Sequence, residues 1–189
     1  LLVGSALLPA TSSAYLIDGT KWLRGEAEFY VAVPGLSASE ISWNSAVIDA
    51  LNNWSTNTLF NFTVVEEYKD PCVVDGFSSI DFSEDYCGSE FGEDTLAVAV
   101  RRLELQELGP PNIIEADIVV NNEERYDIFD GPLAQFGLLN NGVDFKRIAL
   151  HELGHVIGLD HEEANPAIMA PTISDVFELQ EDDIAGVKA

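Results

Sequence analysis

Basic residues are scarce in this chain, which has 9 lysines and arginines against 33 aspartates and glutamates and a formal net charge of −24 at pH 7. A nucleic-acid partner is therefore not expected, because the phosphates would be repelled, and an anionic membrane surface is disfavoured for the same reason. Apart from the N-terminus, no apolar run approaches the roughly 20 residues that span a bilayer. We expect no transmembrane segment.

Cysteine is also scarce, since only Cys72 and Cys87 are present. Two cysteines fit an exported protein, and a disulfide between them would close a modest loop and stabilise the fold by roughly 3 kcal/mol in the chain-entropy model. Neither cysteine has a histidine nearby. A second zinc site at this pair is therefore not expected.

Histidine is equally rare, yet all three histidines fall within eleven residues, from His151 to His161, in the pattern H-E-x-x-H-x-x-G-x-x-H. On a helix His151 and His155 share a face, Gly158 can end the helix, and the chain can return with His161. Three imidazoles leave a fourth zinc position open for water, which is the catalytic arrangement. Glu152 is placed to act as general base.

The motif also has two other interpretations. The polar residues of a helix can match the pattern by chance, and a folded but inactive relative can keep the ligands. Glu152 is present, and inactive relatives most often lose the base. The sequence therefore favours one catalytic zinc ion held by three histidines.

The N-terminus resembles a processing signal. Residues 1–10 are short and apolar, and small residues precede a cleavage position after Ala14. We expect residues 1–14 to be the remnant of a secretory signal peptide and residues 15–189 to form one catalytic domain. A buried N-terminal strand is the alternative. The expected location is secreted, either extracellular or periplasmic.

The remaining chain alternates between strand and helix patterns. A capping box at Ser37 and Glu40 predicts a helix start, and a stripe of Trp43, Val47, Leu51 and Trp54 predicts its buried face. A second helix is predicted after an N-cap at Asp144, and a third begins at about Gln180. Strands are predicted over 28–33, 60–65, 80–82, 95–100 and 115–120, with a break at 110–111.

Residues 66–94 are rich in loops and carboxylates. Oxygen ligands on a flexible loop suit calcium, but no regular calcium-loop motif is present, so a solvated acidic face is the favoured interpretation and a calcium site the alternative. The acidic residues of this segment are Asp70, Asp75, Asp81, Glu84, Asp85, Glu90, Glu93 and Asp94.

Met169 follows His161 by eight residues, in Ala167-Ile168-Met169-Ala170-Pro171. Together with the histidine motif, this segment resembles the metzincin zinc peptidases and their methionine turn. Leu159-Asp160-His161, the proline after the methionine turn and the segment 179–187 are similar to the matrixins, the matrix metalloproteinase group. The resemblance implies that His151, His155 and His161 bind zinc, that Glu152 is the base and that Met169 lies under the metal.

The resemblance also implies a fold. Matrixins are α+β proteins of the metzincin, or zincin-like, type, with a twisted, mostly parallel five-stranded sheet, an antiparallel edge strand, three helices and a small C-terminal subdomain after the third zinc histidine. Substrate would lie along an edge strand that includes Leu96, Ala97, Val98 and Ala99. A hydrophobic S1′ wall would come from Pro171, Thr172 and Ile173.

The implied function is a secreted zinc endopeptidase, a monomer that acts on peptides or proteins with one zinc ion. The alternative is a non-catalytic, zinc-containing peptide-binding module on the same fold. Matrixins hold a second, structural zinc with three further histidines, and this chain has none to spare. In the family, a new N-terminus, here Tyr15, can pair with an aspartate at the position of Asp182-Asp183.

Overall fold

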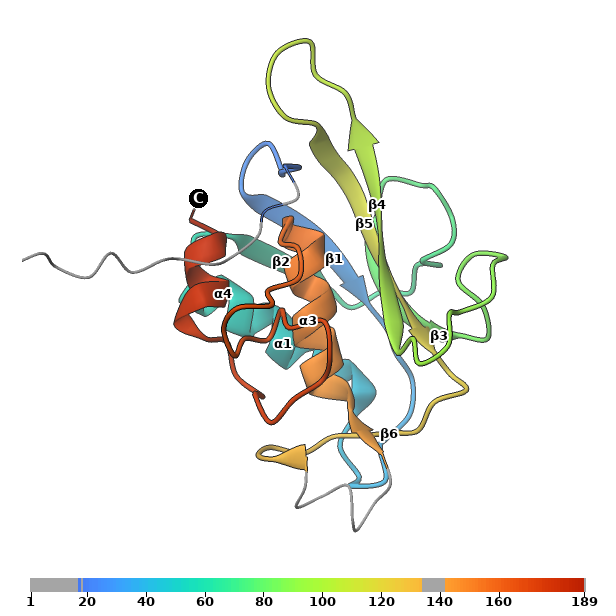
Figure 1. The fold of residues 1–189 in the computed structure, drawn as a ribbon. Coiled ribbons are helices and arrows are strands. Elements are labelled where there is room, and N and C mark those ends of the chain that lie inside the picture. Colours follow the sequence, from blue (N-terminus) through green and yellow to red (C-terminus); the bar gives the residue numbers. More distant parts are fainter. Residues whose placement is uncertain (1–16, 18, 134–141, 189) are drawn as a thin grey trace, which may run out of the picture.

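A five-stranded sheet forms the centre of the computed structural model, which describes residues 17, 19–133 and 142–188 (Figure 1). The strand order is β2-β1-β3-β5-β4, with β4 at one edge and antiparallel to β5, and the other pairs parallel. This confirms the predicted mixed sheet with an antiparallel edge. The strands are β1 (Glu26–Val31), β2 (Asn61–Val65), β3 (Ser78–Ser83), β4 (Ala97–Glu104) and β5 (Asn112–Asn121).

Helices cover one face of this sheet, called here the helix face (Figure 1). Helix α1 (Trp43–Asn57) and helix α3 (Phe145–Ile157) lie side by side on it, and the short helix α4 (Glu181–Gly186) follows the irregular segment after the third histidine. Two short strands, β6 (Tyr126–Asp127) and β7 (Val143–Asp144), pair in parallel before α3. No helix in the described ranges is long and apolar enough to cross a membrane.

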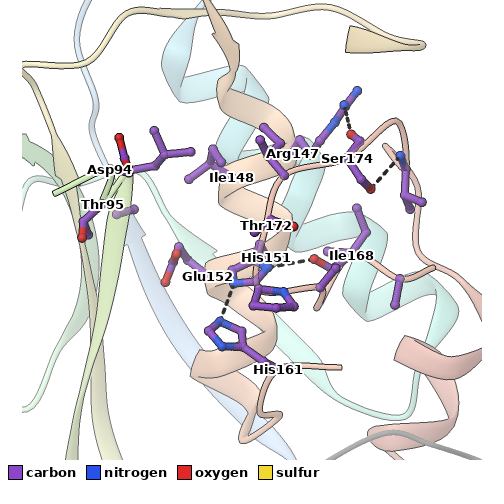
Figure 2. Close-up of a pocket in the computed structure, with 17 residues that line it drawn as sticks. Asp94, Thr95, Arg147, Ile148, His151, Glu152, His161, Ile168, Thr172 and Ser174 are labelled. Carbon is purple, nitrogen blue, oxygen red and sulfur yellow. Dashed lines mark hydrogen bonds between the residues drawn. The ribbon is translucent and has the colours of Figure 1, made fainter. Parts of the chain in front are cut away.

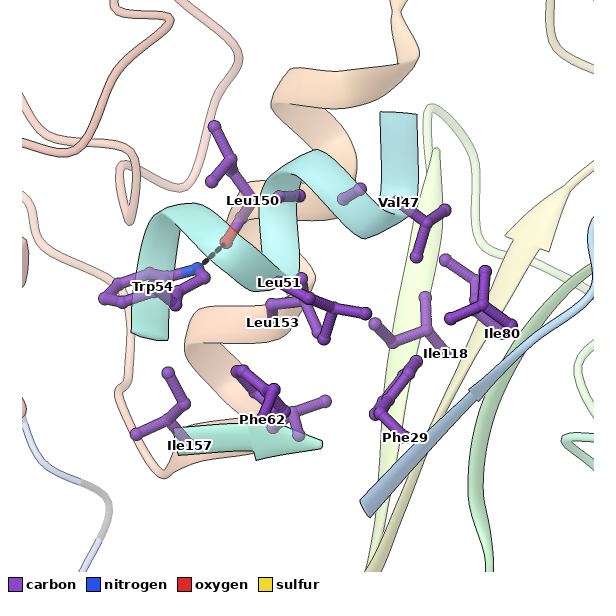
Figure 3. Close-up of a cluster of buried hydrophobic side chains, with 14 of the residues drawn as sticks. Phe29, Val47, Leu51, Trp54, Phe62, Ile80, Ile118, Leu150, Leu153 and Ile157 are labelled. Carbon is purple, nitrogen blue, oxygen red and sulfur yellow. Dashed lines mark hydrogen bonds between the residues drawn. The ribbon is translucent and has the colours of Figure 1, made fainter. Parts of the chain in front are cut away.

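The apolar core lies between the two long helices and the sheet, as Figure 3 shows. The predicted stripe of α1 is confirmed, because Val47, Leu51 and Trp54 are buried in this core and Trp43, which is partly buried, packs against it. Trp54 also donates its indole N–H to the carbonyl of Leu150, at 2.9 Å. The indole therefore connects α1 to α3, the helix that carries His151 and His155.

The predicted start of α1 is wrong. Ser42 is the N-cap, and its side chain accepts a hydrogen bond from the backbone N–H of Ser45. Ser37 instead stabilises a preceding turn by accepting the N–H groups of Ser39 and Ile41, while Glu40 adopts a positive φ of 61°. A serine side chain can accept backbone N–H groups in a turn as readily as at a helix end. The pattern at Ser37 and Glu40 therefore belongs to a turn and not to the start of α1.

The hairpin of β4 and β5 is longer than predicted and projects beyond the rest of the sheet (Figure 1). Strand β4 runs through Arg101 and Arg102, because Arg102 pairs directly with Glu115 of β5. The pairing shifts register after Arg102, and the chain turns at residues 105–111, where the predicted proline break lies. The hairpin therefore continues past the two arginines to Leu103 and Glu104, with one ion pair, Arg102 with Glu115, across its strands.

The opposite face of the sheet, called here the loop face, is covered by the connection between β2 and β3. Phe77 packs edge-on against Tyr30 of β1, with 5.0 Å between ring centroids. The predicted disulfide between Cys72 and Cys87 is confirmed and ties this connection to the segment after β3. The predicted signal remnant, its cleavage position and Tyr15 lie outside the described residues.

Candidate active site

The end of α3 brings the histidines together. His151 and His155 are one turn apart, and Gly158 ends the helix in the left-handed conformation at φ 116°. Its N–H bonds to the carbonyls of Gly154 and His155, and the N–H of Leu159 returns to Gly154. A side chain at Gly158 would also lie 2.8 Å from the carbonyl oxygen of Thr20. Glycine is therefore required both for the turn and for this close approach.

The three imidazoles converge on one point. Their Nε2 atoms are separated by 3.1 Å (His151 to His155), 3.2 Å (His155 to His161) and 3.3 Å (His151 to His161). A tetrahedral zinc ion with bonds of about 2.0–2.1 Å spaces its ligand nitrogens by about 3.3 Å. The triad therefore fits zinc, and the predicted three-histidine site is confirmed.

Backbone carbonyls fix the orientation of two of these rings. Nδ1 of His151 lies 2.8 Å from the carbonyl oxygen of Ile168, and Nδ1 of His155 lies 2.8 Å from that of Leu159. An Nδ1–H bonded to a carbonyl leaves the Nε2 lone pair for a metal. Burial lowers the pKa of both His151 and His155 to about 4, so each ring is neutral at pH 7, as a metal ligand must be.

Glu152 is buried beside the triad and points toward the cleft in Figure 2. Burial raises its pKa to about 8, and a hydrogen bond with the backbone of Ala99 opposes that rise. The carboxylate is therefore held between the ligand helix and β4. A buried carboxylate with a raised pKa is well suited to accept a proton near neutral pH.

Met169 packs beneath the ligand helix. It is buried, and its sulfur contacts Gly154 so closely that a side chain at Gly154 would collide with it. The carboxylate of Asp183 accepts the N–H groups of Ile168 and Met169, both at 3.1 Å, and that of Gln180 at 2.7 Å. Helix α4 therefore holds the methionine turn in place through Asp183, a role that the sequence did not reveal.

A cleft of about 440 Å³ opens beside the triad (Figure 2). The predicted wall residues Pro171, Thr172 and Ile173 line one side, and Leu96 and Ala97 of the predicted edge line the other. Val98 and Ala99 lie further along β4 and are not among the lining residues. Apolar side chains dominate the remaining lining near the metal ligands, with Ile148, Ala167, Ile168, Ala170 and Val176.

Arg147 also lines this cleft, and the sequence analysis missed it. It is only 3% exposed, and its guanidinium donates to the carbonyls of Ser174 and Gly131 and lies 3.5 Å from the carboxylate of Asp144. The available signal was its spacing of four from His151, which puts it on the ligand face of α3. An arginine in an amphipathic helix is usually solvated, so this spacing alone does not predict a buried arginine at the cleft.

Asp144 precedes α3 as its N-cap residue, as predicted, but its side chain makes no capping bond to the helix. The carboxylate instead accepts the N–H of Phe129 at 3.3 Å and faces Arg147. Burial raises its pKa to about 6, and Arg147 opposes that rise. The residue was placed correctly, and its carboxylate contacts Phe129 from a distant segment and Arg147 one turn along the same helix.

Comparison with known proteins gives a family for this geometry. The matrixin family profile matches residues 21–189. Metalloendoproteinase 2-MMP of Arabidopsis thaliana is 27% identical over 173 residues, covering 89% of this chain and 42% of that protein. Metalloendoproteinase 5-MMP of Arabidopsis thaliana is 30% identical over 143 residues, covering 74% and 36%. The chain therefore spans less than half the length of these relatives. Matrilysin of Rattus norvegicus is 43% identical over 53 residues, covering 26% and 20%.

Proposed function

This chain belongs to the matrixin family, and we propose that it is a secreted zinc endopeptidase in which Glu152 is the general base. The observation that carries the proposal is the convergence of three Nε2 atoms beside a buried carboxylate at an apolar cleft. Residues 15–189 would form the catalytic domain of a monomer, and residues 1–14 would be the remnant of its export signal. The disulfide supports an oxidising compartment.

The chemistry requires one metal ion, held by His151, His155 and His161. When bound, zinc lowers the pKa of water toward 7 and polarises a carbonyl group. The two ring–carbonyl contacts keep the ligands oriented without any rearrangement of α3. The packing of Met169 against Gly154 supports the floor of the same site.

Glu152 acts first as general base and then as general acid. Its carboxylate takes a proton from the attacking water as the new carbon–oxygen bond forms, and it delivers that proton to the amine nitrogen as the carbon–nitrogen bond breaks. The contact with Ala99 keeps the carboxylate next to the strand along which substrate would lie. No other protonatable side chain is needed to balance these steps.

Substrate would bind in an extended conformation against the free edge of β4, through main-chain hydrogen bonds. The side chain after the scissile bond would enter the cleft between Leu96 and the wall of Pro171, Thr172 and Ile173. The guanidinium of Arg147 is already engaged by two carbonyls and a carboxylate. We therefore expect an apolar residue to be preferred at this position.

Calcium on the acidic segment 66–94 stays a prediction. In the described part of the chain, the histidine triad is the one group of three or more metal-binding side chains with ligand atoms within 4.8 Å of one another. A calcium site in that segment would therefore depend on backbone carbonyls or on one or two carboxylates, a combination that calcium accepts.

Chelation tests the proposed function. Purified protein should cleave an unfolded protein substrate, lose this activity after treatment with a zinc chelator, and regain it when zinc is restored. A protein that binds peptides but never cleaves them with zinc bound would instead be the non-catalytic binding module.

A further inference from the structure

The far end of the β4–β5 hairpin exposes several leucines. Leu105 is 83% exposed, Leu108 is 94% exposed and Leu103 is 43% exposed. These three residues, called here the leucine extension, lie in a chain whose surface is otherwise strongly acidic. Exposed apolar side chains that gather on one projecting element are characteristic of interaction sites.

The leucine extension continues the strand that borders the cleft. Ala97, Ala99 and Arg101 of β4 pair with the core residues Val120, Ile118 and Ala116, and Leu103 pairs with the core residue Ile113. Paired residues on neighbouring strands share a face. Leu103 therefore lies on the same face as Ala97, which lines the cleft.

The strand between the cleft and the leucines is fixed to the domain. Arg101 Nη1 donates to the carbonyl of His155 at 3.2 Å, and Arg102 Nε lies 3.6 Å from the carboxylate of Glu115. At about 3.4 Å per residue, Leu103 lies about 20 Å along β4 from Ala97, and Leu105 follows directly after the end of the strand. The cleft and the leucine extension therefore lie at the two ends of one strand, which is held to the domain between them.

We propose that the leucine extension is a second substrate contact, which binds apolar residues of an extended polypeptide about eight residues from the scissile bond. This inference rests on the proposed peptidase function and names its substrate class: unfolded or extended chains with an apolar segment at that distance. Antiparallel pairing is the more stable arrangement. It would place residues N-terminal to the scissile bond at the leucine extension.

Continuity with the cleft favours substrate over other occupants. The apolar surface area of three leucines is far smaller than the surface of about 1,200 Å² that a stable protein interface buries. A dimer with a second copy of the chain is therefore disfavoured. The net charge of −24 repels anionic lipids. Substrate already held at the cleft reaches the leucine extension without a separate association step, so even a small apolar contact raises its affinity.

Peptide length provides the test. A peptide cleaved at the site is extended on its N-terminal side by about eight residues that end in an apolar segment, and a second peptide carries the same extension on its C-terminal side. We expect the N-terminal extension to raise kcat/KM about tenfold, which corresponds to about 1.4 kcal/mol. The double variant Leu105→Ser, Leu108→Ser should lose this gain and cleave the short peptide normally.

Leu59→Ser is the matched control, because Leu59 is 80% exposed and precedes β2 at the opposite edge of the sheet. It should keep the full gain. Equal kcat/KM for the short and N-extended peptides, or a gain that survives the double leucine variant, would overturn the inference. So would sedimentation or vesicle binding that shows a dimer or a lipid surface on the leucines in place of the peptide.

Binding separates this inference from the proposed function. The Glu152→Ala variant should bind the N-extended peptide about tenfold more tightly than the short one, measured by fluorescence anisotropy. If no peptide is ever cleaved, the peptidase proposal fails, and this binding ratio still decides the inference. A ratio of one would refute it.

Discussion

Strand β5 buries side chains on both faces of the central sheet, and the two faces differ in chemistry. On β5, Ala116 and Ile118 point to the helix face and belong to the apolar core, while Glu115 and Asp117 alternate with them and point to the loop face. One strand therefore contributes to two kinds of stabilisation. The helix face is stabilised by packing, and the loop face by hydrogen bonds and charges in a buried setting.

Carboxylates organise the loop face. Glu115 accepts the backbone N–H groups of Asp75 and Gly76, and Asp117 accepts both the N–H and the hydroxyl of Ser79. Burial raises the pKa of Asp117 to about 8, and the nearby charge of Glu115 raises it further, against the bonds from Ser79. Conditions that change charge should therefore act on the carboxylate contacts of the loop face and spare the apolar packing of the helix face.

The largest effect is expected on the helix face. Leu153→Ala removes a fully buried side chain and should lower the free energy of unfolding by about 2–5 kcal/mol. Because no titratable group changes, the loss should be the same at pH 5 and pH 8. Urea unfolding measures it, with exposed Leu59→Ala as a control that stays within about 0.5 kcal/mol of wild type. A pH-dependent loss would show that the packing of the helix face is coupled to a titrating group.

The next effect concerns the disulfide. Replacing Cys72 and Cys87 by serine opens a loop with a sequence separation of 15 residues, which should lower the free energy of unfolding by about 3 kcal/mol in the chain-entropy model. The disulfide lies on the loop face, so zinc content and peptide cleavage should persist in the folded variant. Loss of zinc from folded protein would show that the two faces are coupled.

The effect expected for Asp117→Asn is smaller per pH unit, and it grows with pH. Since folding raises the pKa of Asp117 from 3.8 to about 8, the folded state binds more protons between these values. Wild-type stability should therefore fall as pH rises through this range, by at most about 1.4 kcal/mol per pH unit from this group. The variant lacks the group and should gain stability relative to wild type as pH rises.

Thermal melts from pH 5 to pH 8 follow this difference, with exposed Glu84→Gln as the control for a lost surface charge. The control should differ from wild type by a nearly constant amount. A constant difference for Asp117→Asn as well would mean that its carboxylate is ionised in both states.

Salt should have the smallest effect. A net charge of −24 opposes compaction by self-repulsion, and salt screens charges beyond about 8 Å at physiological ionic strength and about 3 Å at 1 M. Melting temperature should rise with sodium chloride after zinc saturation. Calcium should raise it further at fixed ionic strength if the acidic segment holds a site. A flat or falling salt series would contradict the repulsion argument.

The helix face was largely predictable from sequence. The spacing of Val47, Leu51 and Trp54 identified the buried side of α1, and the histidine motif identified the metal ligands and the role of Gly158. These features depend on the geometry of one helix, so local spacing is sufficient. The capping box failed because the same side chains also suit a turn.

The loop face could not be predicted in the same way. Glu115 and Asp117 are acidic residues that a strand pattern assigns to solvent, and only the fold supplies the loop that buries them. The same holds for Arg147 and Asp183, whose roles depend on carbonyls and N–H groups from distant segments. The burial of a charged side chain by a distant segment leaves no periodic pattern in the sequence.

In the proposed function, Glu152 moves the proton at a zinc site formed by the three histidines. The direct test measures zinc content and peptide cleavage together in Glu152→Ala, with exposed Glu163→Ala as the control. We predict that the variant folds and holds one zinc per molecule while cleavage falls by about 10²–10⁴-fold, and that the control behaves as wild type. Near-normal cleavage by zinc-loaded Glu152→Ala would contradict the account.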